Sequence, residues 1–377
     1  MLIKMKIKLF IILLVFSSSV IYSQCNGRYV TQIFNSVSKT TVNYSDQIQY
    51  QDSYHEMDIY TPDGDTASNR PLIIYIHGGT YLGGSKTEID CIDFCEYFAK
   101  KGYVTASVNY RLSSNQLNFV LSQEEQYLTV WNSVADVKAA VRYFRKNYFN
   151  GNNYRIDQNT IFIGGSSAGA VTAVHLAYIN DVLDLPNTSS PNGTSIQALV
   201  NSSGGLEGDV GNNGFSSKIS GVISFSGAIN TPNWIEVQEP PIVSVHGNAD
   251  QTIDFNCAPG LGIPTVLELC GSNEIHNQTN NIGLLNDLLV YDGGDHDWFQ
   301  SGNADSRFVQ ALNFVSSFIY PLLPCNHTTN TSNINSSNFE KKIIQTTNML
   351  GQKNGCLGNI TLFYYNDGTV EKKILIN

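Results

Sequence analysis

The sequence predicts an α/β fold in which a mainly parallel sheet is covered by helices on both faces. From about residue 54, short apolar runs alternate with stretches of helical period, which is typical of repeated strand–helix units. The short runs are mostly apolar and rich in β-branched residues, as expected for strands buried on both faces. The chain has 377 residues, 42% of them hydrophobic, which is enough for one sizeable core.

Each predicted element rests on its own pattern. Residues 42–60 alternate polar and apolar side chains and predict an antiparallel hairpin ahead of the parallel part. The predicted strands of the parallel part are residues 72–76, 104–108, 160–163, 221–225, 242–245 and 288–291. The predicted helices are residues 89–101, 134–147, 168–179 and 307–320. Residues 180–218, rich in Gly, Asn and Ser, predict an insertion that borders the acyl or alcohol pocket.

Both ends of the chain differ from its middle. Residues 1–23 have the basic start, apolar stretch and small residues of a secretory signal peptide. A membrane anchor is the alternative, but the apolar stretch is shorter than the ~20 residues that a bilayer requires. The predicted domains are therefore a signal peptide at 1–23, a catalytic domain at 24–322, a polar linker at 323–339 and a β-rich piece at 340–377.

Charge and cysteine content narrow the class of protein. The net charge is −10 with 22 basic and 32 acidic residues, which disfavours a nucleic-acid partner. Seven Cys have no zinc-binding spacing, and in an exported protein they favour disulfides. We expect Cys257 and Cys270 to pair, and Cys91 and Cys95 to be small buried residues. The odd count leaves at least one thiol unpaired in a monomer.

A strand-turn-helix motif supplies a candidate nucleophile. Residues 161–170 read IFIGGSSAGA, in which G-x-S-x-G follows an apolar strand and precedes a helix of small residues. Such a turn presents a Ser hydroxyl above the sheet, and its glycines permit close packing. We interpret Ser167 as the nucleophile. The alternative is an ordinary helix N-cap, a role that Ser166 or Ser167 could fill.

A glycine-containing loop follows the strand at residues 72–76. It reads His77-Gly78-Gly79-Thr80, and glycines there let the backbone approach a substrate. We expect the N–H groups of Gly79, Thr80 and Ala168 to form an oxyanion hole. A simple strand-ending turn is the alternative.

The remaining partners of a catalytic triad follow in the order acid and then His. Asp250 lies in the loop after the predicted strand at 242–245, and His296 lies in the loop after the strand at 288–291. In this arrangement Asp250 holds the imidazole tautomer, and His296 takes the proton of Ser167. Asp254 is the chief rival acid, while Asp295 and Asp297 are expected to be solvated.

From about residue 54 to residue 320 the chain resembles secreted bacterial carboxylesterases of the α/β-hydrolase superfamily, including feruloyl and acetyl esterases. The matching stretches are MDIYTP, RPLIIYIHGG, SVNYRL, DVKAAVRYFRKN, GGSSAGA, SVHGNAD and GGDHDWF. The resemblance implies an α/β-hydrolase fold and ester hydrolysis through an acyl-enzyme, without cofactor or metal. It assigns the family triad to Ser167, Asp250 and His296. Thr80 departs from the pattern, because many members have a third Gly there.

The C-terminal piece resembles the sorting domain of type IX secretion cargo. Its marks are LGQ at 350–352, a strand run at 361–365 and DGT at 367–369. The resemblance implies a partner in the secretion machinery, and a secreted or cell-surface location. A carbohydrate-binding or adhesion module is the alternative. We expect the tail to be dispensable for hydrolysis in a chain that ends near Pro324.

Two other functions remain open at this point. A serine peptidase of the prolyl-oligopeptidase kind shares the turn and the triad order, but no propeller-like repeat precedes the catalytic domain. A hydrolase fold that has become a binding protein is the second alternative, although its usual loss of the Ser or His is not seen. The acyl and alcohol groups of the substrate stay open, an acylated polysaccharide being one candidate.

Overall fold

The computed structural model describes residue 25, residues 27–185 and 195–326, and the backbone of three strands beyond residue 342. The chain divides into two units, Met1–His327 and Thr328–Asn377. The predicted signal peptide, Cys356 and the predicted linker from residue 327 onward lie outside the described residues. Among the described helices, none has the length and apolar character needed to cross a membrane.

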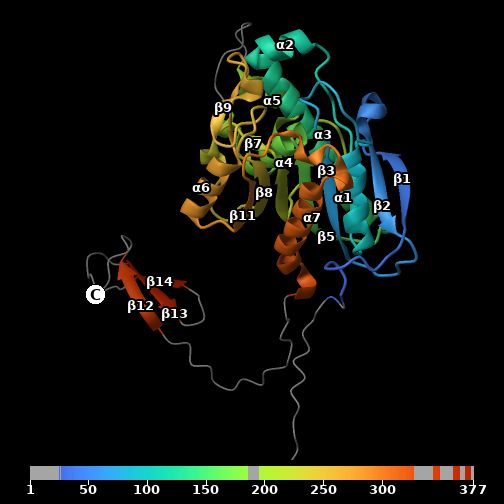
Figure 1. Ribbon diagram of the computed structural model, residues 1–377. Helices are drawn as coiled ribbons and strands as arrows, with labels where there is room; N and C mark the ends of the chain where they lie inside the picture. The colour runs from blue at the N-terminus through green and yellow to red at the C-terminus, as the bar shows by residue number, and fades with distance from the viewer. Residues whose placement is uncertain are drawn as a thin grey trace, which may run out of the picture. The chain divides into compact units, whose positions relative to one another are not determined.

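An eight-stranded sheet forms the frame of the first unit (Figure 1). Its order is β1-β2-β4-β3-β5-β6-β8-β11. The strands are β1 Val37–Asn43, β2 Glu56–Pro62, β3 Arg70–Ile76, β4 Val104–Val108, β5 Ile156–Ser166, β6 Gly221–Phe225, β8 Ile242–Gly247 and β11 Asn286–Tyr291. β2 runs antiparallel to both of its neighbours, and the strands from β4 to β11 are parallel. The predicted α/β class with a mainly parallel sheet is confirmed.

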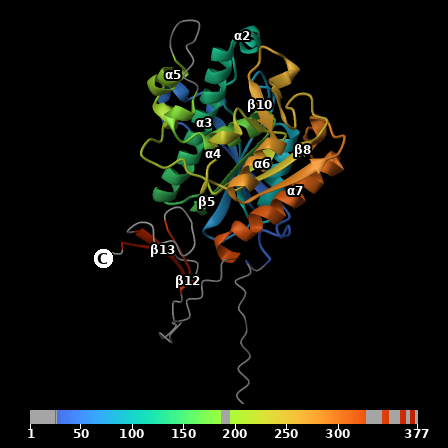
Figure 2. The same ribbon diagram turned by 90° about the vertical axis from the view of Figure 1, so that its left-hand side faces the viewer.

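Helices cover both faces of this sheet (Figure 2). The helices are α1 Ile89–Lys100, α2 Gln116–Leu121, α3 Gln123–Phe149, α4 Ala168–Tyr178, α5 Ile196–Ser202, α6 Ser272–Ile282 and α7 Ser306–Ile319. Alternate residues of β3 explain the two layers, since Leu72 and Ile74 pack with α3 and α4 while Ile73 and Tyr75 pack with α1 and α7. Every residue of β3 is buried, which is why its sequence is apolar from Pro71 to Ile76.

Several elements differ from the expectation. The predicted hairpin at 42–60 is correct in kind, but its strands are β1 and β2, joined by two short 3-10 turns. Helix α3 begins earlier than predicted, because the Ser122 hydroxyl accepts a hydrogen bond from the N–H of Glu125 and caps it there. Helices α2, α5 and α6 were not expected. A small sheet of β7 Ala228–Ile229, β10 Glu268–Gly271 and β9 Cys257–Pro259 was not expected either.

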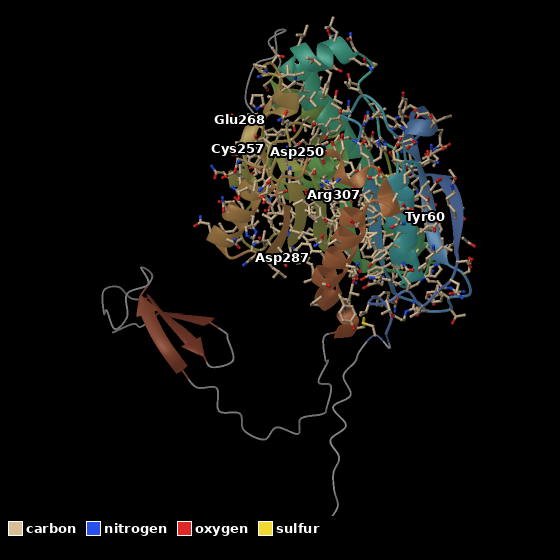
Figure 3. The ribbon with its side chains drawn as sticks, in the orientation of Figure 1. Tyr60, Asp250, Cys257, Glu268, Asp287 and Arg307 are labelled. Carbon is tan, nitrogen blue, oxygen red and sulfur yellow. A yellow bond between two sulfur atoms is a disulfide. The ribbon has the colours of Figure 1, made fainter. Side chains whose placement is uncertain are left out.

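Two disulfides connect the described part of the chain. The expected pair Cys257–Cys270 is confirmed and joins β9 to β10, on which Glu268 also lies (Figure 3). Cys25–Cys325 was not expected and joins residues that are 300 positions apart. Cys91 and Cys95 are free and fully buried, as expected.

The Cys25–Cys325 bond also bears on where the catalytic unit ends. We expected this domain to stop at residue 322, whereas the first unit extends to His327. The reason is that Leu323 is buried and Cys325 is bonded to the start of the chain. A shortened enzyme therefore has to keep Cys325 rather than end near Pro324.

We expect Cys25→Ser to lower the free energy of unfolding, because the disulfide restricts the unfolded chain. For a loop of this length the chain-entropy estimate is about 6 kcal/mol. Denaturant unfolding without reductant measures it. Cys325→Ser and the double variant should give the same loss, since each breaks the same bond. Losses that add in the double variant would contradict this account.

The second unit contains a three-stranded antiparallel sheet. Its strands are β12 Ile343–Asn348, β13 Ile360–Tyr365 and β14 Val370–Ile374, with β13 between the other two. The piece is thus β-rich along these residues.

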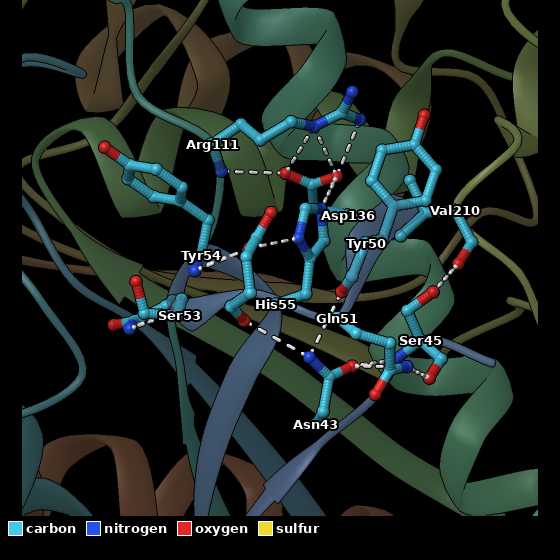
Figure 4. A network of polar contacts seen from close by, with 12 residues as sticks. Asn43, Ser45, Tyr50, Gln51, Ser53, Tyr54, His55, Arg111, Asp136 and Val210 are labelled. Carbon is cyan, nitrogen blue, oxygen red and sulfur yellow. Dashed lines mark hydrogen bonds and ion pairs between the residues drawn. The ribbon is translucent and has the colours of Figure 1, made fainter. Parts of the chain in front are cut away.

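A buried polar network ties the loop after β4 to helix α3 (Figure 4). Arg111 donates to Asp136 from its backbone N–H at 2.8 Å and from Nε at 2.9 Å. His55 lies between Asp52, at 2.7 Å, and Asp136, at 3.4 Å. Burial lowers the pKa of His55, but these two carboxylates outweigh it and raise the pKa. The network fixes the position of Tyr110, which precedes Arg111 and contacts the site described next.

Candidate active site

The turn between β5 and α4 places the side chain of Ser167 at the carboxyl end of the sheet. Ser167 has φ 51° and ψ −123°, a backbone conformation that residues other than glycine rarely adopt. Its N–H donates to the carbonyl of Phe225 at 2.8 Å, which fixes the turn against β6. Gly165 and Gly169 are required here: a Cβ on Gly165 would lie 2.6 Å from the carbonyl oxygen of Ile76.

Three side chains from three different loops form one hydrogen-bonded line. His296 Nε2 lies 2.8 Å from Ser167 Oγ, and His296 Nδ1 lies 2.6 Å from Asp250 Oδ2. All three residues are less than 10% exposed. The structure therefore brings together the Ser, His and Asp that the sequence singled out. Ser166 points elsewhere, because its hydroxyl donates to Asp90 at 2.7 Å.

The carboxylate of Asp250 has partners on both oxygens. Oδ1 accepts from the N–H groups of Thr252 and Ile253 at 2.8 and 2.9 Å. His246 Nε2 lies 3.2 Å from Oδ2, on which His296 also lies. Burial raises the pKa of Asp250, but these two histidines and the N–H of Ile253 outweigh it and hold the pKa far below its usual range. Asp250 is thus a fixed anion throughout the range in which His titrates.

The rival acid lies outside this line. The carboxylate of Asp254 accepts from the N–H of Asn256 at 2.7 Å and does not contact His296. Asp295 is exposed, with its nearest ion pair to Arg307 at 3.4 Å.

The loop that carries His296 is anchored by an aromatic side chain. Trp298 is fully buried, and its indole N–H donates to the hydroxyl of Ser226 at 2.9 Å. The ring of Phe299 stands edge-on to the His296 ring at 5.5 Å. This packing limits the rotation of the His296 imidazole.

The loop after β3 has the geometry of a donor loop. Gly79 has φ 110° and Thr80 has φ 60°. Among the hydrogen bonds of the described residues, none uses the N–H of Gly79, Thr80 or Ala168 as donor. Tyr110 anchors the start of this loop, because its hydroxyl donates to the carbonyl of His77 at 3.0 Å.

Thr80 stands where many of the resembling esterases have a third glycine. A positive φ is costly for a β-branched residue, which gives a physical reason for glycine at this position. The neighbouring His77 is buried against Tyr110, with ring centroids 4.3 Å apart. Burial lowers the pKa of His77 to about 4, so its ring is neutral and structural.

A cleft of about 440 Å³ opens over this site. Its lining includes Gly79, Thr80, Ser167 and His296, while Ala168 lies behind Ser167 at the first position of α4. Glu88, Asp90 and Asp297 give the lining an acidic character, and none of its residues is Lys or Arg. In the described part of the chain, no three His, Cys, Asp or Glu side chains are placed to hold a metal ion.

The insertion at 180–218 does not line this cleft with any of its described residues. Leu185, Ile196 and Val200 line a different, apolar cavity instead. The expectation that the insertion borders the acyl or alcohol pocket is thus not confirmed at the catalytic cleft, which its described residues do not line.

Asp90 is a buried carboxyl group beside the nucleophile turn. It accepts from Ser166 at 2.7 Å, and the hydroxyl of Tyr75 lies 3.4 Å away. Burial raises the pKa of Asp90 from 3.8 to about 6, and these hydrogen bonds only partly offset it. The folded protein therefore binds a proton at Asp90 more tightly than the unfolded chain does.

We expect Asp90→Asn to stabilise the fold above pH 6 and to have little effect near pH 4. A raised carboxyl pKa makes the native protein lose stability as pH rises from about 4 to about 6. The amide avoids this loss, which is on the order of 3 kcal/mol. Urea unfolding at pH 4 and pH 8 measures the difference. Ser166→Ala, which removes a bond to the charged form, should steepen the loss. An equal effect of Asp90→Asn at both pH values would contradict the assignment.

Sequence reasoning did not find Asp90, His246 as a partner of Asp250, or the Trp298–Ser226 contact. His246 had a signal, because it ends a strand four residues before Asp250. Asp90 had a weaker one, since it is an acid on the apolar side of a predicted helix. The remaining contact joins residues 72 positions apart and depends on packing.

Comparison with known proteins agrees with this geometry. The BD-FAE family matches residues 57–261, more than half of the chain. The chain belongs to the BD-FAE family. The matched range contains Ser167, Asp250 and the Gly79 loop, while His296 lies beyond it.

Solved structures show that this BD-FAE chain shares the α/β-hydrolase fold of esterases. Thermogutta terrifontis esterase 2 phosphorylated by paraoxon is 20% identical with a TM-score of 0.52, covering 74% of this chain and 93% of that one. A truncated carbohydrate esterase from gut microbiota is 20% identical with a TM-score of 0.52, covering 76% and 96%.

Curated relatives match a shorter part of the BD-FAE chain. Gut esterase 1 of Caenorhabditis elegans is 31% identical over 110 residues, which are 29% of this chain and 18% of that protein. Pyrethroid hydrolase Ces2a of Mus musculus is 32% identical over 123 residues, or 32% and 20%. The chain thus spans about a fifth of the length of the curated relatives it matches.

Proposed function

We propose that this chain hydrolyses carboxylic esters through a covalent acyl-enzyme on Ser167. In the first step Ser167 Oγ attacks the ester carbonyl, and its proton passes to His296 Nε2. The tetrahedral intermediate then collapses, the bond to the alcohol oxygen breaks, and His296 returns the proton to the leaving alkoxide. The acyl group remains on Ser167 as an ester.

The second half repeats the chemistry with water as nucleophile. His296 takes a proton from the water as its oxygen attacks the acyl carbonyl, and the proton returns to Ser167 Oγ as the carboxylic acid leaves. Asp250 keeps the Nδ1–H tautomer and stabilises the imidazolium that forms in each step. The N–H groups of Gly79, Thr80 and Ala168 are the proposed donors to the oxyanion.

The single observation that supports this proposal most strongly is the hydrogen-bonded line Ser167–His296–Asp250 in one cleft. A 2.8 Å contact between Oγ and Nε2 lets a proton move in the direction that nucleophilic attack requires. Membership of the BD-FAE family and the esterase names of its relatives point to the same class of substrate.

Labelling with a fluorophosphonate tests the mechanism. Mass spectrometry should find one adduct, on Ser167, and labelling should remove the hydrolysis of p-nitrophenyl acetate in proportion. Ser202→Ala, a change on the outer face of α5, should label normally. An adduct on Ser166, or a protein that neither labels nor hydrolyses esters, would overturn the proposal. The second result would favour the binding-protein alternative.

We also propose that the chain is exported, with residues 1–23 as signal peptide and residues 340–377 as a sorting domain. The two disulfides support an oxidising compartment. An enzyme that ends after Asn326 should keep its hydrolytic activity but should be missing from the cell-surface and secreted fractions. This result would support the role of the tail in export. An acylated polysaccharide remains a candidate substrate, to be tested by acid release from such polymers.

A further inference from the structure

A second cavity, of about 80 Å³, has no lining residue in common with the catalytic cleft, but it is lined by Tyr81, the residue after Thr80. Its walls come from α2 and α3, from α4, from the insertion, and from the segment that leads into β10. Most of these walls are apolar or aromatic, including Phe119, Trp131, Val171 and Trp234.

Three polar side chains of the cavity wall are hydrogen-bonded within the protein, whereas the indole N–H of Trp131 is buried without a hydrogen-bond partner. Gln126 donates to the carbonyl of Phe119 at 2.7 Å and accepts from the N–H of Leu267 at 2.8 Å. His175 Nδ1 donates to the carbonyl of Val171 at 2.7 Å, and Asn230 donates to Glu268 at 2.7 Å. The cavity therefore offers water few partners, although its volume has room for several water molecules.

Two wall residues connect this cavity to the nucleophile turn. Tyr81 directly follows the proposed donors Gly79 and Thr80, and its hydroxyl donates to the carbonyl of Ala168 at 2.9 Å. Val171 donates from its N–H to the carbonyl of Ser167 at 2.9 Å, so it stands one helical turn from the nucleophile. A substituent on the acyl carbon of a substrate at Ser167 thus lies within reach of an apolar space.

The size of the cavity favours a chain over a ring. An engineered apolar cavity of about 150 Å³ binds benzene, and this cavity has roughly half that volume. An unbranched alkyl chain of a few carbons is narrower than an aromatic ring and suits the smaller space.

The walls are held by cross-links between distant segments. Gln126 joins α3 both to α2 and to residues 265–267. The Cys257–Cys270 disulfide holds β9 against β10, beside the wall residue Leu269. A preformed wall of this kind binds a chain without first having to become ordered.

We propose that this cavity binds the unbranched alkyl chain of the substrate's acyl group, so that the preferred acyl group is a short alkanoyl such as butanoyl. The inference rests on the proposed function, because it places the acyl carbon on Ser167. Tyr81 and Val171 form the entrance, and Trp234 and Val266 limit the length of chain that fits.

Hydrolysis of p-nitrophenyl acetate, butanoate, hexanoate and benzoate tests the proposal. For the wild-type enzyme kcat/KM should rise about fourfold for each methylene that the cavity accepts, hence about fifteenfold from acetate to butanoate. Benzoate should be the poorest substrate of the four.

Two substitutions at the far wall should act in opposite directions. Val266→Phe fills the cavity and should bring the butanoate-to-acetate ratio of kcat/KM close to one. Trp234→Ala enlarges it and should move the optimum from butanoate to hexanoate. Leu183→Phe is the matched control, because Leu183 belongs to the same insertion, is 75% exposed and does not line the cavity. Its chain-length profile should equal that of the wild type.

The outcomes separate this proposal from the proposed function. An enzyme that fails to label with a fluorophosphonate and hydrolyses none of the four esters contradicts the serine mechanism itself. An enzyme that labels at Ser167, but whose chain-length profile is the same in Val266→Phe, Trp234→Ala and wild type, contradicts only the acyl cavity. A preference for benzoate over butanoate would contradict it too. If Val266→Phe does not fold, Trp234→Ala alone decides.

Discussion

Ser167→Ala and His296→Ala should each lower kcat for p-nitrophenyl acetate by about 10⁶ if the proposed mechanism is correct. Without Oγ no acyl-enzyme forms, and without the imidazole no group within 3 Å of Oγ accepts its proton. The double variant should be no slower than either single variant, because the two side chains act as one unit. Circular dichroism and unfolding curves should show that all three variants remain folded.

The measurement requires matched controls, since residual activity from a contaminating esterase sets a floor. Ser202→Ala and His276→Ala change the same residue types away from the cleft, and both should keep the wild-type kcat. Undiminished turnover in Ser167→Ala would exclude Ser167 as nucleophile. Losses that multiply in the double variant would show that the two residues act separately.

Asp250→Asn should lower kcat by about 10⁴, the loss seen when the acid of a serine protease triad becomes an amide. The amide carries no charge, and its NH2 group donates where Oδ2 accepts, so His296 loses both the acceptor that fixes its Nδ1–H and the anion that stabilises its imidazolium. KM should change little, because Asp250 does not line the cleft.

Asp254→Asn is the matched control for this experiment and should keep nearly full activity. The two acids lie four residues apart on one loop, but only Asp250 contacts His296. Equal losses in the two variants would point to a disturbed loop rather than a missing charge. A larger loss in Asp254→Asn than in Asp250→Asn would show that Asp254, and not Asp250, is the acid of the triad.

The sequence predicted the central strands and the candidate triad because both follow from local rules. β3 and β6 are rich in β-branched and aromatic residues and are followed by turn residues, so their positions are visible without the fold. Parallel strands bring their carboxyl ends to one edge, so Ser167, Asp250 and His296 could be expected to meet there. The same rule applies to the Gly79 loop after β3.

What escaped prediction depends on contacts between distant segments. Helix α6 is polar along most of its length and forms because a few residues such as Ile275 reach the core. Cys25 pairs with Cys325 only because the fold brings these two distant segments together, which spacing cannot reveal. Asp90 and the apolar cavity likewise arise where side chains of separate elements meet. Local pattern predicts elements and strand ends, whereas the shape of a binding space requires the packed core.

The Cys25–Cys325 bond has a mechanical consequence. A pulling force on the chain beyond residue 326 acts on the catalytic unit at Cys325. The disulfide transmits part of this force directly to Cys25. Cys25 lies beside Arg28 and Tyr29, whose backbone and side chain bond to Lys101, Gly102 and Asp65. Traction therefore cannot peel α7 from the sheet one turn at a time, as it could with a single covalent attachment. If the tail fastens this enzyme to a surface in flowing liquid, drag would act on a closed covalent loop whose active-site strands all lie inside it.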